Sequence, residues 1–401
     1  MVPVEAYLAE VLAIAHPLAP VLLGLEEAEG GVLAEDATAR CPLPSFDNSS
    51  MDGYAVQASD VAAAAPEAPA VLPVTGQITA GDTSPHTISP GSCVRIMTGA
   101  PLPDGADAVV PVEWTDGGRD QVAISQPARP GNAIRRRGDD VAEGELMVPA
   151  GARLGPVQIS LLAAGGYSEA MVRPRPHVAV IATGNELTEP GRPLVPGRIW
   201  DSNSYLLAAA VRQAGGVAQR HRVKDDPDAV VAALDELSAS ADLIVTSGGI
   251  SMGGEHDVVK AALTGHAEVA FRKVAMQPGM PQGFGVVGPA RTPLFTLPGN
   301  PVSAYVSFHL FVRPAMAARQ GLAPVPPPLT RAVLTAGVSS PPGRRSYLRA
   351  VLDAAAGTVA PLPGQASHQL GALAQANALI VVPEPVAGME AGETADVMSL
   401  P

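Results

Sequence analysis

The chain has 401 residues, enough for about two to four domains, each with its own buried core. Its 26 basic and 39 acidic residues give a formal net charge of -13, which disfavours a sequence-independent nucleic-acid binder. Cys41 and Cys93 lack metal-ligand spacing, so neither a disulfide framework nor a zinc site is expected. Because no export signal and no membrane-length apolar run is visible, we expect a soluble, cytoplasmic protein without membrane contact.

The N-terminal part is predicted to contain a β-rich region between two helical pieces. Alanine, leucine and glutamate at helical spacing predict a helix over residues 4–15. Residues 30–140 carry short valine and isoleucine runs broken by glycine, proline and aspartate, which is typical of strands. A second helix is predicted over residues 155–164, opened by Pro156 and closed by Gly165. This arrangement indicates an inserted domain.

From residue 177 onward, predicted strands and helices alternate. The strands are at 178–182, 217–223 and 242–246, and the helices are at 204–214, 228–238, 256–263 and 301–319. Such alternation predicts a parallel, doubly wound α/β sheet. After a stiff linker formed by Pro324 and Pro326 to Pro328, strands at 333–338, 347–352 and 378–382 predict a small C-terminal β domain.

Three loops follow the predicted strands at the edge where doubly wound sheets bind ligands. They read TGNEL at 183–187, SGGISMG at 247–253 and PGNPVS at 298–303. The glycines at 247–253 allow backbone N–H groups to face an anion, or they simply reverse the chain. Asn300 and Pro301 equally fit a helix N-cap and first turn. Glu186 and Asp257 are either solvated loop acids or ligands of a divalent cation that also binds phosphate.

Two polar segments of the β-rich region have the same ambiguity. FDNSSMDGYAV at 46–56 is a polar, turn-prone segment that enters a strand, and its simplest interpretation is an Asx-rich turn. RRRGDD at 135–140 carries three cations, which either bind phosphate or occupy a solvated rim.

These segments, taken in order, resemble the motifs of the molybdopterin molybdenumtransferases, the family of bacterial MoeA and the gephyrin E domain. The matching segments are 46–56, 95–100, 138–140, 183–187, 247–253, 298–304, 367–368 and 374–377. The resemblance covers essentially the whole chain. It implies a transferase that inserts molybdenum, supplied as molybdate, into adenylylated molybdopterin to form the molybdenum cofactor, with release of AMP and with Mg²⁺ present.

The resemblance also implies a multidomain α/β architecture. It has an elongated helical domain (1–29 and 141–174), an inserted β-rich domain (30–140), a molybdopterin-binding α/β domain (175–323) and a C-terminal β domain (324–401). It implies a homodimer whose active site is shared between subunits. The catalytic residues carried over are Asp52, Thr98 and Asp140 from one subunit, with Glu186 and Asp257, the candidates for Mg²⁺, from the other. The substrate-binding residues that match family motifs are Asp225 or Asp226, Ser247, Gly248, Gly249, Pro298, Pro301 and Ser367. Lys273, Arg345 and Arg349 are added to them as candidate substrate-binding cations.

One family feature is missing from this chain. Gln277 and Met280 stand where the family commonly has lysines, so Lys273, Arg345 and Arg349 become the candidates for binding the oxyanion. Two other functions therefore stay open, a gephyrin-like scaffold and a molybdopterin adenylyltransferase. The retained acids and the complete C-terminal domain favour the molybdenum-inserting enzyme. Its further expected partners are an adenylyltransferase and the apoenzymes that accept the cofactor, while preference for molybdate over tungstate is not fixed by the sequence.

Overall fold

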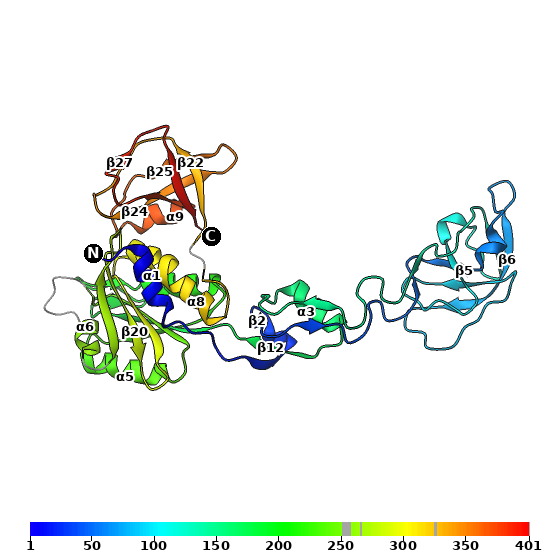
Figure 1. Cartoon of the computed structure of the whole chain (residues 1–401), viewed down its shortest axis with the longest axis horizontal. Helices are drawn as coiled ribbons and strands as arrows, with labels where there is room; N and C mark the ends of the chain where they lie inside the picture. The colour runs from blue at the N-terminus through cyan, green and yellow to red at the C-terminus, as the bar shows by residue number, and fades with distance from the viewer. Residues whose placement is uncertain (251–257, 265–266, 325–326, 401) are drawn as a thin grey trace. The chain divides into compact units, whose positions relative to one another are not determined.

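The computed structural model describes residues 1–250, 258–264, 267–324 and 327–400. The chain separates into two compact units (Figure 1). Unit 1 comprises Met1–Val21, Gly30–Ala34 and Met171–Pro401, and unit 2 comprises Leu22–Glu29 and Glu35–Ala170. Among the described residues, no helix has the length and apolar character needed to cross a membrane.

Six strands form the central sheet of unit 1, in the order β16-β13-β17-β21-β20-β18. Their bounds are β13 (His177–Thr183), β16 (Val217–Val223), β17 (Leu243–Ser247), β18 (Glu268–Lys273), β20 (Pro281–Val287) and β21 (Thr292–Leu297). The first four strands of this order run parallel, as the alternation of strands and helices predicts. The sheet is nevertheless mixed, because β20 runs antiparallel to both β21 and β18. A short turn joins β20 to β21, and antiparallel neighbours need no crossover helix.

Helices cover both faces of this sheet, as a doubly wound fold requires. Successive side chains of a strand point to opposite faces, so Val178 and Val180 of β13 enter one core and Ala179 and Ile181 enter another. The first core contains α1 (Val4–Leu12), α4 (Asn203–Gln213), α7 (Pro301–Ser307), the π-helical η3 (Phe308–Val312) and α8 (Arg313–Arg319). The second contains α5 (Pro227–Ser238) and α6 (Val258–Leu263).

Helix α1 packs into the α/β core of unit 1. The Tyr7 ring meets the edges of Phe284 and Phe311, at centroid distances of 5.2 and 4.7 Å. The Val2 N–H also donates to the Lys273 carbonyl at 2.7 Å. The expectation that α1 belongs to an elongated helical domain with residues 141–174 is therefore not met, because the apolar face of α1 is buried elsewhere. The other expected domain boundaries stay predictions.

The C-terminal part of unit 1 is a closed ring of five strands. In order around the ring these are β24 (Arg345–Asp353), β25 (Thr358–Pro361), β22 (Leu329–Leu334), β28 (Thr394–Ser399) and β26 (Ala378–Val382), which pairs again with β24. Their inward side chains form a separate apolar core. This is the small β domain predicted from the sequence. The remaining elements of this part are β19 (Met276–Gln277), which pairs with β24, and β23 (Val338–Ser339), β27 (Gly388–Met389) and α9 (Leu370–Gln375).

Unit 2 is built around a five-stranded sheet in the order β8-β5-β7-β6-β9. Its strands are β5 (Gly53–Val56), β6 (Ala70–Ile78), β7 (Cys93–Ile96), β8 (Ala108–Pro111) and β9 (Gln121–Ile124). Tyr54 and Val56 enter one core while Ala55 enters the other, so both faces are covered. Shorter elements are α2 (Leu25–Ala28), α3 (Pro156–Ala164), β3 (Ala37–Thr38), β4 (Asn48–Ser49), β10 (Ile134–Arg135), β11 (Leu146–Val148), η1 (Ala58–Val61) and η2 (Val112–Trp114). The β-rich region and the second helix are thus as predicted.

A further small sheet has three strands. It consists of β1 (Val21–Gly24), β12 (Glu169–Arg173) and β2 (Val32–Leu33).

Candidate functional site

A pocket of about 370 Å³ lies at the carboxyl ends of β13 and β17. The chain runs from β13 to β16 on one side and then to β17 on the other, so the strand order reverses between β13 and β17. Doubly wound sheets bind ligands at this reversal point. Thr183 and Ser247, the last residues of the two strands, line the pocket. The other lining residues are Ala182, Glu186, Leu187, Ile199, Trp200, Asp201, Ser202, Asn203, Gly248, Gly299, Asn300, Pro301, His368 and Leu370.

The pocket floor is held together by Asn203. Its Nδ2 donates to the Ser247 hydroxyl at 2.9 Å and to the Gly299 carbonyl at 2.6 Å, linking α4 to the loops after β17 and β21. The Gly248 N–H donates to the Leu297 carbonyl at 3.0 Å. That amide is therefore not aimed at a ligand, which corrects the anion-binding role predicted for it. A Cβ on Gly299 would lie 3.4 Å from the Gly248 Cα, so these glycines let two loops approach closely.

Gly249 is also a packing residue. Its φ is +69°, and a Cβ there would lie 2.6 Å from Cγ2 of Val259 on α6. Of the predicted segment 247–249, Ser247 and Gly248 line the pocket, whereas Gly249 does not. Asp257 lies outside the described residues, so its predicted role stays a prediction.

The C-terminal domain supplies one wall of the pocket. Nδ2 of Asn300 donates to Oγ of Ser367 at 2.9 Å, and the Val302 N–H donates to the Ser367 carbonyl at 3.1 Å. Asn300 occupies the N-cap position of α7, but its side chain makes no capping bond, because it binds Ser367 instead. Pro301 takes the first helical position and lines the pocket, while Pro298 lies earlier in the same loop. The predicted residue Ser367 thus joins the C-terminal domain to the pocket.

Glu186 places an exposed carboxylate at the pocket rim. Its oxygens lie against Gly184, where a Cβ would be 2.6 Å from Oε2 of Glu186. The Glu186 carbonyl accepts from the Ile199 N–H at 2.9 Å, at the start of the pairing between β14 (Leu187–Thr188) and β15 (Ile199–Trp200). Glu186 therefore lies where a ligand in the pocket would meet it, and its role as a ligand stays a prediction.

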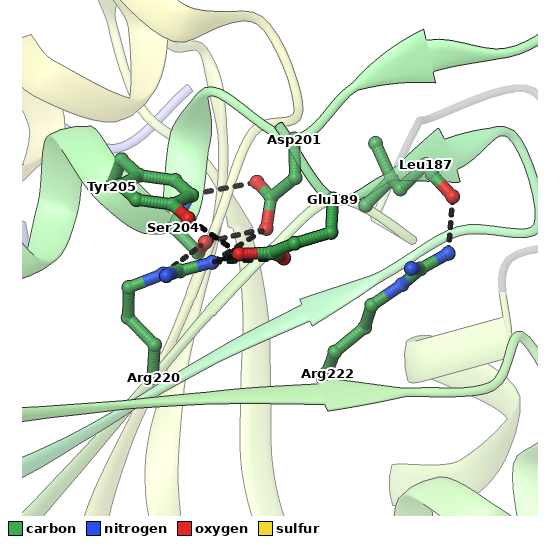
Figure 2. A network of polar contacts seen from close by, with 7 residues as sticks. All are labelled: Leu187, Glu189, Asp201, Ser204, Tyr205, Arg220 and Arg222. Atoms are coloured by element: carbon green, nitrogen blue, oxygen red, sulfur yellow. Dashed lines mark hydrogen bonds and ion pairs between the residues drawn. The ribbon is translucent and has the colours of Figure 1, made fainter. Parts of the chain in front are cut away.

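Sequence reasoning missed a polar network beneath the loop between β13 and α4 (Figure 2). Asp201 is 2% exposed and accepts from the Ser204 N–H at 3.0 Å. Arg220 of β16 donates from Nε to the Ser204 hydroxyl at 2.9 Å and from Nη2 to Glu189 at 3.1 Å. Its guanidinium stacks on the Tyr205 ring at 3.4 Å. The Tyr205 hydroxyl and Arg220 lower the pKa of Glu189.

This network fixes the segment from Leu187 to Asn203 that forms the outer wall of the pocket. The available signal was the run of polar residues at 219–222, which belong to the edge strand β16 of the sheet.

In unit 2, the predicted residues Asp52 and Thr98 are in direct contact. Oδ1 of Asp52 accepts from the Thr98 N–H at 2.7 Å and from the Thr98 hydroxyl at 2.8 Å. The backbone bond, followed by the hydroxyl bond, lowers the pKa of Asp52. The adjacent Gly53 is required by sheet packing, because a Cβ there would lie 1.9 Å from the Val110 carbonyl oxygen. Asp52 is thus an exposed, ionised carboxylate on a rigid strand end.

The basic segment 135–140 lies against the same polar turn of unit 2. β10 pairs with β4, and Nη1 of Arg136 forms an ion pair with Oδ2 of Asp47 at 2.6 Å. The Arg137 N–H donates to Oδ1 of Asp47 at 2.8 Å, and its guanidinium lies 3.4 Å from Glu143. Two of the three cations are therefore paired with acids. Asp140 is exposed nearby, and its N–H donates to the Leu43 carbonyl at 3.0 Å.

Comparison with known proteins covers nearly the whole chain. Three family profiles match: "MoeA N-terminal region (domain I and II)" at 2–166, "Probable molybdopterin binding domain" at 179–318 and "MoeA C-terminal region (domain IV)" at 331–400. "Molybdopterin molybdenumtransferase 2" of Mycobacterium tuberculosis is 50% identical over 388 residues, which cover 95% of each chain. "Molybdopterin molybdenumtransferase" of Haemophilus influenzae is 35% identical, covering 94% of this chain and 92% of that relative. The chain belongs to the MoeA family of molybdopterin molybdenumtransferases.

Comparison with solved structures shows that this MoeA-family enzyme also shares the fold of the family. The crystal structure of a molybdopterin biosynthesis MoeA protein from a Pyrococcus species matches with a TM-score of 0.78 and 32% identity, covering 100% of this chain and 99% of that one. The family assignment and the multidomain α/β fold expected from the sequence motifs are thus confirmed.

Some predicted substrate residues of this MoeA-family chain have structural roles instead. Asp226 caps α5, where its carboxylate accepts from the Ala229 N–H at 3.0 Å, and Asp225 precedes it in the loop after β16. Arg345 forms ion pairs with Glu5 and, at 3.1 Å, with Glu384. The charge of Arg345 is thus compensated within the chain, and its binding of substrate stays a prediction. Exposed Lys273 ends β18, and its carbonyl accepts from Val2.

Arg349 remains a candidate for binding an anion in this MoeA-family chain. Its side chain is fully buried, and Nη2 donates to the carbonyls of Gly364 and, at 3.1 Å, Ala366. Nε and Nη1 have no hydrogen-bond partner among the described residues. Burial lowers the pKa of Arg349. A buried guanidinium with two unsatisfied donors is costly unless an acceptor binds there. Gln277, at a family lysine position, accepts a 3.3 Å bond from Arg344.

Proposed function

We propose that this chain inserts molybdenum, supplied as molybdate, into adenylylated molybdopterin, which completes the molybdenum cofactor and releases AMP. The observation that carries the proposal is the pocket at the reversal of strand order, whose walls are the three family loops after β13, β17 and β21. The names of the relatives, molybdopterin molybdenumtransferases at 35–50% identity, support the same reaction.

The pocket lining suits a substrate with a polar phosphoanhydride and a flat ring system. Ser247 and Ser202 offer hydroxyl groups that donate or accept hydrogen bonds. Trp200 is 51% exposed, and its Nε1 donates to the Arg192 carbonyl at 3.0 Å, which leaves its ring faces available for stacking. The chain thereby holds the substrate in one orientation, and such positioning contributes directly to the rate.

A divalent cation is part of this proposal. Among the described residues no three acidic, histidine or cysteine side chains gather into a metal site. Mg²⁺ is, however, commonly bound by one or two carboxylates together with phosphate oxygens, so Glu186 at the pocket rim fits as one ligand. Asp257 would be a second ligand. When bound, such an ion neutralises charge on the phosphoanhydride.

Binding of the molybdate anion needs positive charge or hydrogen-bond donors, which the site must supply from residues other than Gln277 and Met280. Gln277 and Met280 cannot supply charge, whereas Arg349 offers two unsatisfied donors beside the 364–366 loop, which leads directly to Ser367. We therefore assign the oxyanion to the neighbourhood of Arg349 and Ser367.

The proposed assembly is a homodimer with an active site shared between subunits. Asp52, Thr98 and Asp140 belong to unit 2, whereas Glu186, Ser247 and Pro301 belong to unit 1, and dimerisation would bring the two groups together as in the family resemblance. The reaction is placed in the cytoplasm, in keeping with free Cys41 and Cys93. An adenylyltransferase would supply the substrate, and apoenzymes would accept the product.

The test is to incubate the purified protein with adenylylated molybdopterin, Mg²⁺ and molybdate, and to measure AMP together with molybdenum bound to the pterin. We expect Glu186→Ala to lower the rate by roughly 10² or more, because misplacement in the site has effects of that size. Glu236→Ala is the matched control, since Glu236 is exposed on α5.

Two results would contradict the proposal. Absence of AMP release by the parent protein would favour a scaffold, and consumption of ATP with unmodified molybdopterin would favour an adenylyltransferase.

A further inference from the structure

Three cations line a second pocket next to the candidate site. This pocket has a volume of about 340 Å³ and is lined by Gly184, Asn185, Arg198, Arg222, Val223 and Lys224. No acidic side chain is among these residues, although the chain as a whole has a net charge of -13. The pocket is therefore a local concentration of positive charge on an acidic protein.

The cations are brought together by the sheet. Arg222 pairs with Ala182 in the register of β16 and β13, so it lies near the carboxyl end of the sheet, and Lys224 follows two residues later. Nη2 of Arg222 donates to the Leu187 carbonyl, which fixes the guanidinium against the loop (Figure 2). Arg198 precedes β15, whose partner strand begins at Leu187. The arrangement thus depends on strand pairing and on one anchoring hydrogen bond.

The charges of this pocket are exposed and only partly compensated, since Arg222 is among the groups that lower the pKa of Glu189. Within 1–250, 258–264, 267–324 and 327–400, Arg198 and Lys224 form no ion pair, and the bond of Arg222 is to a neutral carbonyl. Like charges held close together repel one another, and a bound anion relieves that repulsion. Arginine side chains and an amide such as that of Asn185 are donors suited to a tetrahedral oxyanion.

We propose that this pocket binds a phosphoryl-type dianion through Arg198, Arg222 and Lys224. Two sources have this chemistry, the phosphate of a nucleotide and a free tetrahedral oxyanion. The first source rests on the proposed function, in which AMP is released. Loop 183–187 lines both pockets, so a nucleotide held in the candidate site lies next to this one. The second source does not depend on that function.

The experiment is calorimetric titration of the full-length protein with inorganic phosphate at low ionic strength. The test variant is Arg198→Gln combined with Lys224→Gln, and Arg222 is left in place because it anchors the loop. The control is Arg331→Gln combined with Arg212→Gln, which changes the net charge equally at two exposed positions outside the pocket. We expect the Kd for phosphate to rise roughly tenfold or more in the test variant and to stay unchanged in the control.

Absence of phosphate binding by the parent, or equal weakening in test and control variants, would overturn the proposal. Competition distinguishes the two sources: AMP but not adenosine displaces phosphate if the pocket holds a nucleotide phosphate, whereas neither displaces it if the ligand is a free oxyanion. AMP release is measured separately. A parent that binds phosphate in this pocket but releases no AMP would refute the proposed function and leave the pocket assignment standing.

Discussion

Thr98 donates two hydrogen bonds to a single carboxylate oxygen of Asp52, and this pair yields a test at the scale of one residue. Thr98→Val keeps the side-chain shape and the backbone donor but removes the hydroxyl. We expect the pKa of Asp52 to rise without reaching its ordinary value, because the backbone bond, the larger cause of the lowering, remains. Titration of the Asp52 carboxyl by NMR in both proteins measures this. An unchanged pKa would mean that the hydroxyl bond does not form in solution.

The single residues also show where sequence reasoning stops. The motifs directed attention to Thr183, Glu186 and Ser247, which line the pocket, because these residues come at or after the ends of strands that the sequence predicts. Arg345 was assigned to substrate because nothing in the sequence shows that Glu5 and Glu384 already compensate its charge. Asn203 was missed for the same reason, since its partners Ser247 and Gly299 are distant in sequence.

The π-helical element η3 buries a histidine, and this burial predicts a dependence of stability on pH. His309 is 3% exposed, its Nε2 has no partner in the described structure, and burial together with Arg313 lowers its pKa from 6.5 to about 4. Between these two values the unfolded chain binds a proton that the folded chain does not. The free energy of unfolding should therefore fall as the pH drops from 6.5 to about 4, by roughly 3 kcal/mol at most.

The measurement is urea denaturation of the parent and of His309→Gln at pH 7 and at pH 5, followed by a probe in unit 1. The parent should lose more stability than the variant on acidification, and the difference between them isolates His309 from the other titrating groups. Equal losses in both proteins would show that His309 is protonated in the folded state.

Helices and strands whose apolar residues recur at a regular spacing could be predicted from the sequence. Strands whose position depends on close backbone contact with a neighbouring strand could not. Strand β13 and helices α4 and α5 appear near their predicted positions. The strand is a continuous apolar run, as expected when both faces are buried, and the helices repeat apolar residues on one buried face. The segment of β20 reads QGFGVV and has no such pattern. Its Gly285 is required because a Cβ would lie 2.0 Å from the Glu268 carbonyl oxygen of β18, a contact that exists only in the folded sheet.

At the scale of the whole molecule, the shared-site proposal predicts that two inactive variants restore each other. Asp52→Ala alters unit 2 and Glu186→Ala alters unit 1. In a mixed dimer with shared sites, one site carries both substitutions and the other carries neither, so mixing should recover AMP release that each variant lacks. The samples are unfolded together and refolded to exchange subunits, and a sample of each variant treated alone is the control. No recovery in a dimer shown to be mixed would place each complete site within one subunit.

The burial of α1 has a consequence for the order in which the protein is made. The Tyr7 ring packs against Phe284 and Phe311, and Glu5 pairs with Arg345, so α1 waits during synthesis for partners that are added much later. At about 5–20 residues per second, ribosomes need tens of seconds to deliver those partners. The segments of unit 2, 22–29 and 35–170, lie close together in the sequence and require no such delay. The apolar face of α1 is therefore left without its native partners during translation for longer than the core of unit 2.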